Sequence, residues 1–164
     1  MAPGSAGTGS NHGYALLYKL LGDEKDVSKL LIIKRERAEL NELVKSISET
    51  AGRAHKQLEA FARADETLNL KDRGLPTPEE QTRAAIAKTR SKELLTEGGK
   101  DLEVQLLLTQ NEALTYGAHL AQTLARTERD VARSRYFTDL AGELAQLQRK
   151  VGGMLLENYT WKSK

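Results

Sequence analysis

The sequence contains no cysteine and has few proline and aromatic residues. Among its 164 residues there is no cysteine, proline occurs three times and aromatic residues make up 5%. The lack of cysteine excludes disulfides, thiolate zinc sites and cysteine nucleophiles, but it fits a reducing cytosol and a simple exported protein equally well. The remaining composition is rich in Ala, Leu, Glu, Lys and Arg, which favours helices over a β-sandwich.

The chain also lacks a large net charge, since its formal net charge is +2, and it lacks a long apolar run. Because 25 basic residues stand against 23 acidic ones, the chain has no strong field to attract phosphates or lipids, and we expect no nucleic-acid partner. No apolar run approaches the ~20 residues that span a bilayer, and the start lacks a charged region followed by an apolar stretch. We therefore expect no transmembrane segment.

The first thirteen residues differ in composition from the rest. Residues 1–13 are small, polar and Gly-rich, as in a flexible tether or in the tail that remains after a signal or lipoprotein peptide is removed. This predicts a flexible polar tail over 1–13, with a lipid anchor as one possibility for its end. Residues 14–164 are predicted to form a single helical domain.

Apolar residues recur every three to four positions after this tail, which is the pattern of amphipathic helices. Thr77-Pro78-Glu79-Glu80 adds an N-cap, a first-turn proline and two carboxylates at a helix start. The predicted helices cover 14–21, 24–68 (one helix, or two joined by a kink near Gly52), 77–97, a segment beginning near 100, and 127–156. Whether 127–130 form a turn or only a kink stays open.

These elements predict the fold class. Four helices of roughly 20–40 residues joined by short turns pack most simply as an all-α, antiparallel up-and-down four-helix bundle, with 14–21 as a short extra N-terminal helix. The residues predicted on the apolar core stripes are Leu40, Val44, Ile47, Ala51, Ala54, Leu58, Phe61, Leu102, Leu106, Leu107, Ala113, Leu114, Gly117, Leu120, Leu124, Phe137, Leu140, Leu144, Leu147, Val151 and Met154.

A carboxylate and histidine metal site is the first chemistry to seek in such a bundle. His55 and Glu59 lie one helical turn apart, and Glu112, Tyr116 and His119 form a second line on another helix. The four metal candidates are therefore His55, Glu59, Glu112 and His119, which share one ion if their helices are neighbours. Against this hypothesis, all four flank apolar positions, and none of the histidines shows the Glu-x-x-His spacing of di-iron bundles.

Other candidate features favour ordinary structural roles. A possible basic patch consists of Arg126, Arg129, Arg133 and Arg135. Because acidic residues interrupt it, we interpret it as a solvated helix face with local ion pairs. Gly98-Gly99 lacks the Lys-Ser or Lys-Thr of a phosphate-binding loop, and no nucleophile with its base is evident, so we predict a protein that is not an enzyme and has no cofactor. Tyr159 and Trp161 are expected to close the base of the bundle.

Four short motifs follow one another in the chain: HKQLEAFARA from His55, Gly74-Leu75-Pro76, Glu93-Leu94-Leu95 and the run from Gly99 to Glu103. Together they resemble a bacterial ferritin-like family of exported helical domains of unknown function, in a likeness that spans about Lys29 to Leu156. The family carries a second histidine where this chain has Leu114, with His119 displaced, and a further one in the last helix, which here has none. The resemblance implies a ferritin-like fold and export to the bacterial envelope, and it carries over only His55.

The function expected from the sequence is that of a non-enzymatic helical domain of the bacterial periplasm or outer envelope. It would act by binding another protein or by self-association as a homo-oligomer through an exposed apolar face. The alternative is a ferritin-like metal-binding protein that uses His55, Glu59, Glu112 and His119. A third possibility is a coiled-coil-like assembly subunit, because the heptads of the second and last predicted helices are regular.

Overall fold

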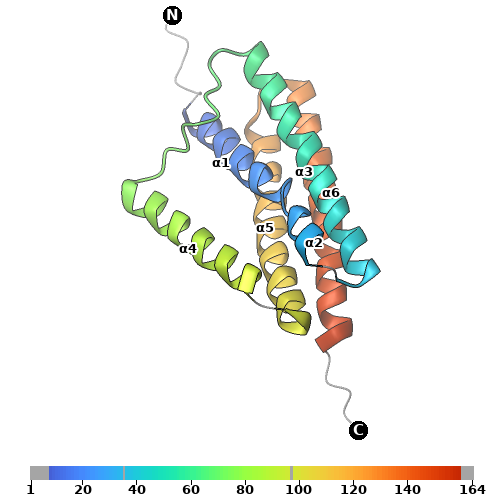
Figure 1. Ribbon diagram of the computed structural model, residues 1–164. Helices are drawn as coiled ribbons and strands as arrows, with labels where there is room; N and C mark the ends of the chain where they lie inside the picture. Colours follow the sequence, from blue (N-terminus) through green and yellow to red (C-terminus); the bar gives the residue numbers. More distant parts are fainter. Residues whose placement is uncertain (1–7, 35, 97, 160–164) are drawn as a thin grey trace, which may run out of the picture.

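The computed structural model describes residues 8–34, 36–96 and 98–159, and these residues form six α-helices and no strand (Figure 1). The predicted all-helical class is confirmed. The helices are α1 (Thr8–Glu24), α2 (Lys29–Ile33), α3 (Ala38–Ala64), α4 (Thr77–Thr96), α5 (Gly99–Thr127) and α6 (Val131–Tyr159). Within this described part, no helix is both long and apolar enough to cross a membrane. The Tyr159 side chain and Trp161, which were expected to close the base, lie outside it.

Four of the helices surround one apolar core. Helix α1 contacts α3 and α5, and α6 contacts the same two helices from the other side. Figure 1 shows α1 and α6 running in the opposite direction to α3 and α5, so each contact joins antiparallel neighbours. The stripes predicted on α3, α5 and α6 form this core, although four of the predicted residues, Phe61, Ala113, Leu120 and Met154, are half-buried.

Helix α1 contributes more to this core than the sequence predicted. It begins at Thr8, so residues 8–13 are helical and do not belong to the predicted flexible tail; the other residues of that prediction, 1–7, lie outside the described part of the chain. Its side chains Tyr14, Leu17 and Leu21 are fully buried. The predicted short extra helix is therefore a central member of the packing, whereas α4, which was expected among the four, buries none of its residues.

Helix α1 packs closely on α5 because each helix has a glycine at the contact, Gly13 on α1 and Gly117 on α5. A Cβ atom at Gly117 would lie 2.8 Å from Leu20 Cδ2, and one at Gly13 would lie 2.7 Å from Leu124 Cδ2. Both distances are shorter than a van der Waals contact, so a larger residue would force these leucine side chains to move. The Gly-rich start is helical because it fits this contact.

The predicted helix over 24–68 is divided, but not at Gly52. The chain leaves helical geometry at Lys34, which is extended (φ −119°, ψ 108°), and α3 then runs unbroken to Ala64. Since α1 and α3 are antiparallel, the chain must reverse between them, and a break inside α3 would not do this. Gly52 is tolerated because its neighbour Ala51 is buried and holds that turn on the core.

A turn, and not a kink, separates α5 from α6. Glu128 is extended (φ −72°, ψ 129°), and its carboxylate Oε1 accepts a hydrogen bond from the Asp130 backbone N–H at 2.9 Å. The Asp130 carboxylate Oδ1 in turn accepts from the Arg133 N–H at 2.8 Å, as an N-cap does. These side chains satisfy the free backbone donors at the start of α6.

Candidate functional site

Helix α4 is the element whose packing the chain leaves incomplete. It has twenty residues, and none of them is buried. Its contact with the rest of the molecule is made chiefly with α5. Most of the stability of a helix in a folded protein comes from packing an apolar face, so a helix of this length without a buried face is expected to gain a partner.

The segment before α4 holds its N-terminal end against α1. The Asn11 side chain makes two hydrogen bonds to the backbone of Asn69, donating to the carbonyl at 3.2 Å and accepting from the N–H at 2.6 Å. His12 lies 3.5 Å from the Asp72 carboxylate. These contacts fix residues 69–72 on the first turns of α1, so the start of α4 cannot swing freely.

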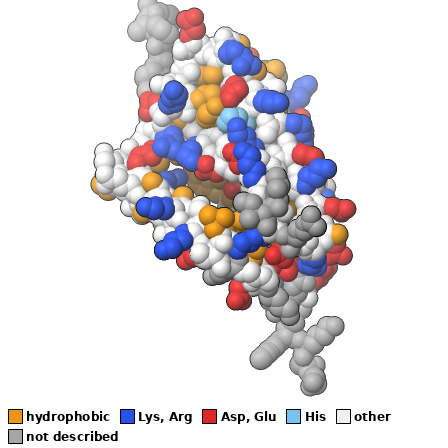
Figure 2. Space-filling model, viewed as in Figure 1, with side chains coloured by type: hydrophobic (Ala, Val, Ile, Leu, Met, Phe, Trp, Pro, Cys, Tyr) orange, Lys and Arg blue, Asp and Glu red, His pale blue; other side chains and the backbone are white. Residues whose placement is uncertain are grey.

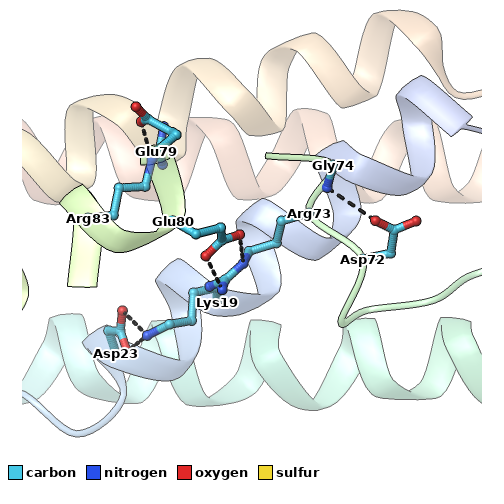
Figure 3. Close-up of polar contacts among 8 residues, drawn as sticks. All are labelled: Lys19, Asp23, Asp72, Arg73, Gly74, Glu79, Glu80 and Arg83. Carbon is cyan, nitrogen blue, oxygen red and sulfur yellow. Dashed lines mark hydrogen bonds and ion pairs between the residues drawn. The ribbon is translucent and has the colours of Figure 1, made fainter. Parts of the chain in front are cut away.

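An arginine at the end of this segment orients the first turn of α4. Figure 3 shows Arg73 reaching Glu80 on α4, with two hydrogen bonds of 2.9 and 2.5 Å. Both side chains are half-buried, and a two-pronged guanidinium–carboxylate contact fixes direction as well as distance. The N-terminal end of α4 is therefore attached firmly.

Polar contacts also join the middle of α4 to α5. Arg90 pairs with the Glu112 carboxylate at 2.7 Å. Arg83 is bonded to Glu79 at 2.7 Å and also contacts the Tyr116 hydroxyl; both contacts raise the pKa of the guanidinium, with Glu79 having the larger effect. Such exposed pairs contribute little stability, typically below about 1 kcal/mol each. They orient α4 without burying it.

A hollow lies beneath α4. Figure 2 shows it between α4 and the neighbouring part of the bundle, with hydrophobic surface visible at its bottom. Helix α4 also carries a recess of about 340 Å³, lined by Ala85, Ile86, Thr89, Arg90 and Glu93. Ile86 in this recess is 46% exposed, although its neighbour Arg90 faces α5. On α5, the side chains of Leu108 and Tyr116 are similarly exposed. We call α4 and this hollow the α4 surface.

A second polar cluster, formed by His55, Glu59 and Tyr18, lies where α1 packs on α3. The Tyr18 ring stacks on the imidazole with ring centroids 4.1 Å apart, and its hydroxyl donates to Glu59 Oε1 at 2.9 Å. His55 Nδ1 lies 3.4 Å from the same oxygen. Gly22 lies beside the ring, since a Cβ at this position would touch His55 Nε2 at 3.4 Å.

Burial lowers the pKa of the His55 imidazole, and the nearby Lys25 ammonium lowers it further, against a smaller opposing effect of Glu59. Desolvation disfavours the charged imidazolium more than one carboxylate favours it. His55 is therefore held neutral, with its ring fixed by Tyr18 and Glu59. Tyr18 was not singled out in the sequence, because only packing between helices reveals the stack.

The four predicted metal residues are not brought together. His55 and Glu59 adjoin, but Glu112 is exposed and paired with Arg90 of α4, and His119 lines a groove between α5 and α6. Throughout the described ranges, no group of three or more His, Asp or Glu side chains is arranged to hold a metal ion. The spacing along each helix was read correctly, but the pair on α3 and the pair on α5 do not meet.

One arginine of the predicted basic face, Arg133, takes part in the internal structure. Arg133 pairs with Asp65 at 3.0 Å and lies over the Phe61 ring at 5.5 Å from its centroid. It also contacts Tyr14, whose hydroxyl donates to Glu128 and whose pKa is raised, first by burial. Arg133 thus closes one end of the core, while Arg126, Arg129 and Arg135 are exposed.

The groove between α5 and α6 is the other surface recess, with a volume of about 540 Å³. Small and polar residues line it: Thr115, Ala118, His119, Gln122, Ala125, Arg126, Thr138, Ala141, Gly142, Ala145 and Gln148. Large exposed apolar side chains are missing from this lining, in contrast to the α4 surface. The α4 surface is therefore the better candidate for binding.

Comparison of the chain with protein-family models, with curated proteins and with solved structures gives no match. Its function is therefore inferred from its own residues.

Neutral His55 leads to a prediction on pH dependence. The folded pKa lies below the value of about 6.5 expected in the unfolded chain, so the unfolded state binds the proton more tightly. The contribution of His55 to stability is therefore complete above pH 6.5 and is lost as the pH falls toward the folded pKa. NMR titration of the His55 ring should give a midpoint below 6.5 in the native protein and near 6.5 in urea. A native midpoint at or above 6.5 would contradict the burial argument.

Proposed function

We propose that this chain is a non-enzymatic, ferritin-like four-helix bundle domain of the bacterial cell envelope that acts by binding another protein at the α4 surface. The four helices of the bundle would be α1, α3, α5 and α6, with α4 outside them. The envelope location rests on the sequence resemblance alone. Binding at the α4 surface rests on one observation, a twenty-residue helix none of whose residues is buried.

The chemistry around the hollow indicates which kind of partner fits. Ile86, Leu108 and Tyr116 offer exposed apolar area, and the Arg90–Glu112 pair offers charged groups beside it. A partner helix with one apolar face and a polar edge would bury the first and form hydrogen bonds with the second. The firmly attached start of α4 would limit the cost in entropy of closing on such a helix.

Site-specific photo-crosslinking in the producing cell tests this proposal. A photoreactive residue at position 86 should give one discrete adduct with a protein, whereas the same residue at Val131, which is 74% exposed on α6, should give none. An adduct of twice the mass of this chain would identify self-association. Equal labelling from both positions, or no adduct from position 86, would contradict binding at the α4 surface.

The alternative function, metal binding, is supported only by the adjoining pair His55 and Glu59. Two ligands from one helix do not complete the four-coordinate or six-coordinate sites that zinc, iron or magnesium prefer. Metal analysis of the purified protein, repeated with His55→Ala and His119→Ala, decides between the two functions. Bound metal that is lost in both variants would favour metal binding.

A further inference from the structure

Two polar side chains meet inside the contact between α1 and α5. Glu24 is in the last turn of α1, and Gln110 is a buried residue in the middle of α5. The Gln110 side chain is hydrogen-bonded to the Glu24 carboxyl in a way that favours its ionised form, so the amide N–H is the donor. One hydrogen bond therefore joins the two helices at this point.

Each partner also has one buried oxygen left over. Glu24 Oε2 and Gln110 Oε1 are both shielded from solvent, and neither has a hydrogen-bond partner among the described residues. Leaving a buried acceptor unsatisfied costs about 1–3 kcal/mol, and native proteins rarely leave two on one contacting pair. With an ionised carboxylate, neither of these two oxygens can serve the other, because both are acceptors only.

A proton on Glu24 satisfies both oxygens at once. If Glu24 Oε2 carries the proton, its O–H becomes a donor. Gln110 Oε1 is then available as the acceptor, because it belongs to the side chain that already bonds this carboxyl and has no other partner. The carboxylic acid and the amide then face each other with two hydrogen bonds, one in each direction. No ligand or further side chain is needed for this arrangement.

We propose that Glu24 and Gln110 form a neutral carboxylic acid–amide pair that locks the C-terminal end of α1 onto α5, and that loss of the proton releases this lock. The charged groups around the pair agree with a neutral acid. Asp23, on the same helix, disfavours a second negative charge. On or beside the helices that pack around α1, six charged or titratable side chains pair with one another, as Arg37–Glu103, Arg90–Glu112 and His55–Glu59.

The energetics give the lock a working range of pH. Burial, as the largest cause, raises the pKa of Glu24 to about 7, well above the value of about 4.3 in an unfolded chain. The folded state therefore binds the proton more tightly than the unfolded state does. The stabilisation is complete below the unfolded pKa and is lost as the pH rises through 7. This is the opposite direction to His55, so variants of the two residues separate their effects.

Thermal unfolding of Glu24→Gln at two pH values tests the proposal. Glutamine has nearly the same shape, stays neutral and can form two hydrogen bonds with Gln110. We expect the variant to match the native protein at pH 4, below the unfolded pKa, and to unfold roughly 4 °C or more above it at pH 8, where the native carboxyl has ionised. Glu157→Gln, which removes a carboxylate from an exposed position of α6, controls for net charge.

Two measurements on the native protein do not depend on any variant folding. The Glu24 carboxyl carbon should titrate in NMR with a midpoint near 7. Amide exchange over residues 20–25, corrected for intrinsic rates, should increase about tenfold or more between pH 6 and pH 8, and Glu24→Gln should abolish this increase. A midpoint near 4, or a Glu24→Gln protein that is less stable at both pH values, would indicate an ionised carboxylate bridged by water and would overturn the proposal.

Discussion

Replacement of Phe137 by alanine is expected to lower the free energy of unfolding by about 3–5 kcal/mol, the usual loss for a fully buried aromatic residue. Phe137 is completely buried, and its ring centroid lies 5.0 Å from that of Tyr14, 5.7 Å from that of Tyr136 and 6.2 Å from that of Phe61. Because these rings come from α1, α3 and α6, one substitution weakens three helices. Urea unfolding followed by circular dichroism measures the loss.

Val131→Ala is the matched control for this experiment. Val131 is on the same helix, six residues earlier, and largely exposed. Its truncation should change the free energy of unfolding by less than about 0.5 kcal/mol. If both substitutions had similar effects, the aromatic residues would not form the end of the core, and the place of α1 in the bundle would have to be revised.

Gly74→Ala is expected to cost about 2 kcal/mol, for two separate reasons. Gly74 has a φ of +65°, which alanine rarely adopts, and a Cβ atom there would fall on the His12 imidazole ring. The ring would have to move away from Asp72, which it contacts at 3.5 Å. Thermal or urea unfolding measures the loss.

Two other glycines separate these causes. Gly99 has nearly the same φ, +63°, but open space around it, so Gly99→Ala should show the backbone cost alone, about 1 kcal/mol. Gly98 has an ordinary φ of −145° and also open space, so its substitution by alanine should be nearly neutral. If Gly74→Ala and Gly99→Ala cost the same, the segment before α4 would not be packed on α1.

Sequence and structure agree best where one helix contains the whole signal. The buried residues of α3, from Leu40 through Ile47 to Leu58, recur every three or four positions. Such a stripe can be hidden only by packing the helix along its length, so the period predicts both the helix and its buried face. The heptads of α6, from Phe137 to Val151, were predicted for the same reason.

Helix α4 shows where this reasoning fails. Its start was predicted correctly from Thr77 and Pro78, since a helix N-terminus is a local matter. The position of α4 outside the core was not predicted, although the sequence of this helix indicates it. Ile86 is flanked by Arg83 and Arg90 on the same face, so α4 has no continuous apolar stripe. The length of a helix and its capping residues predict that the helix forms, but they do not predict which surface it packs against.

The four candidate metal residues show a different limit of sequence reasoning. His55 and Glu59 are one turn apart on one helix and remain together, as spacing predicts. Glu112 and His119 are two turns apart on α5, yet one pairs with Arg90 of α4 and the other lines the groove beside α6. Which faces of two helices meet depends on their rotation about their own axes, and no spacing within one helix determines that rotation.

The sequence alone determined the helical class, the bounds of α4, the start of α5 and the core faces of α3, α5 and α6, because each of these depends on residues within a few turns of one another. Tertiary packing decided that the Gly-rich residues 8–13 are helical, that α1 and not α4 completes the core, and that Glu24 meets Gln110 and Tyr18 meets His55. These outcomes depend on contacts between residues far apart in the chain, where the fit of one surface to another outweighs local preference.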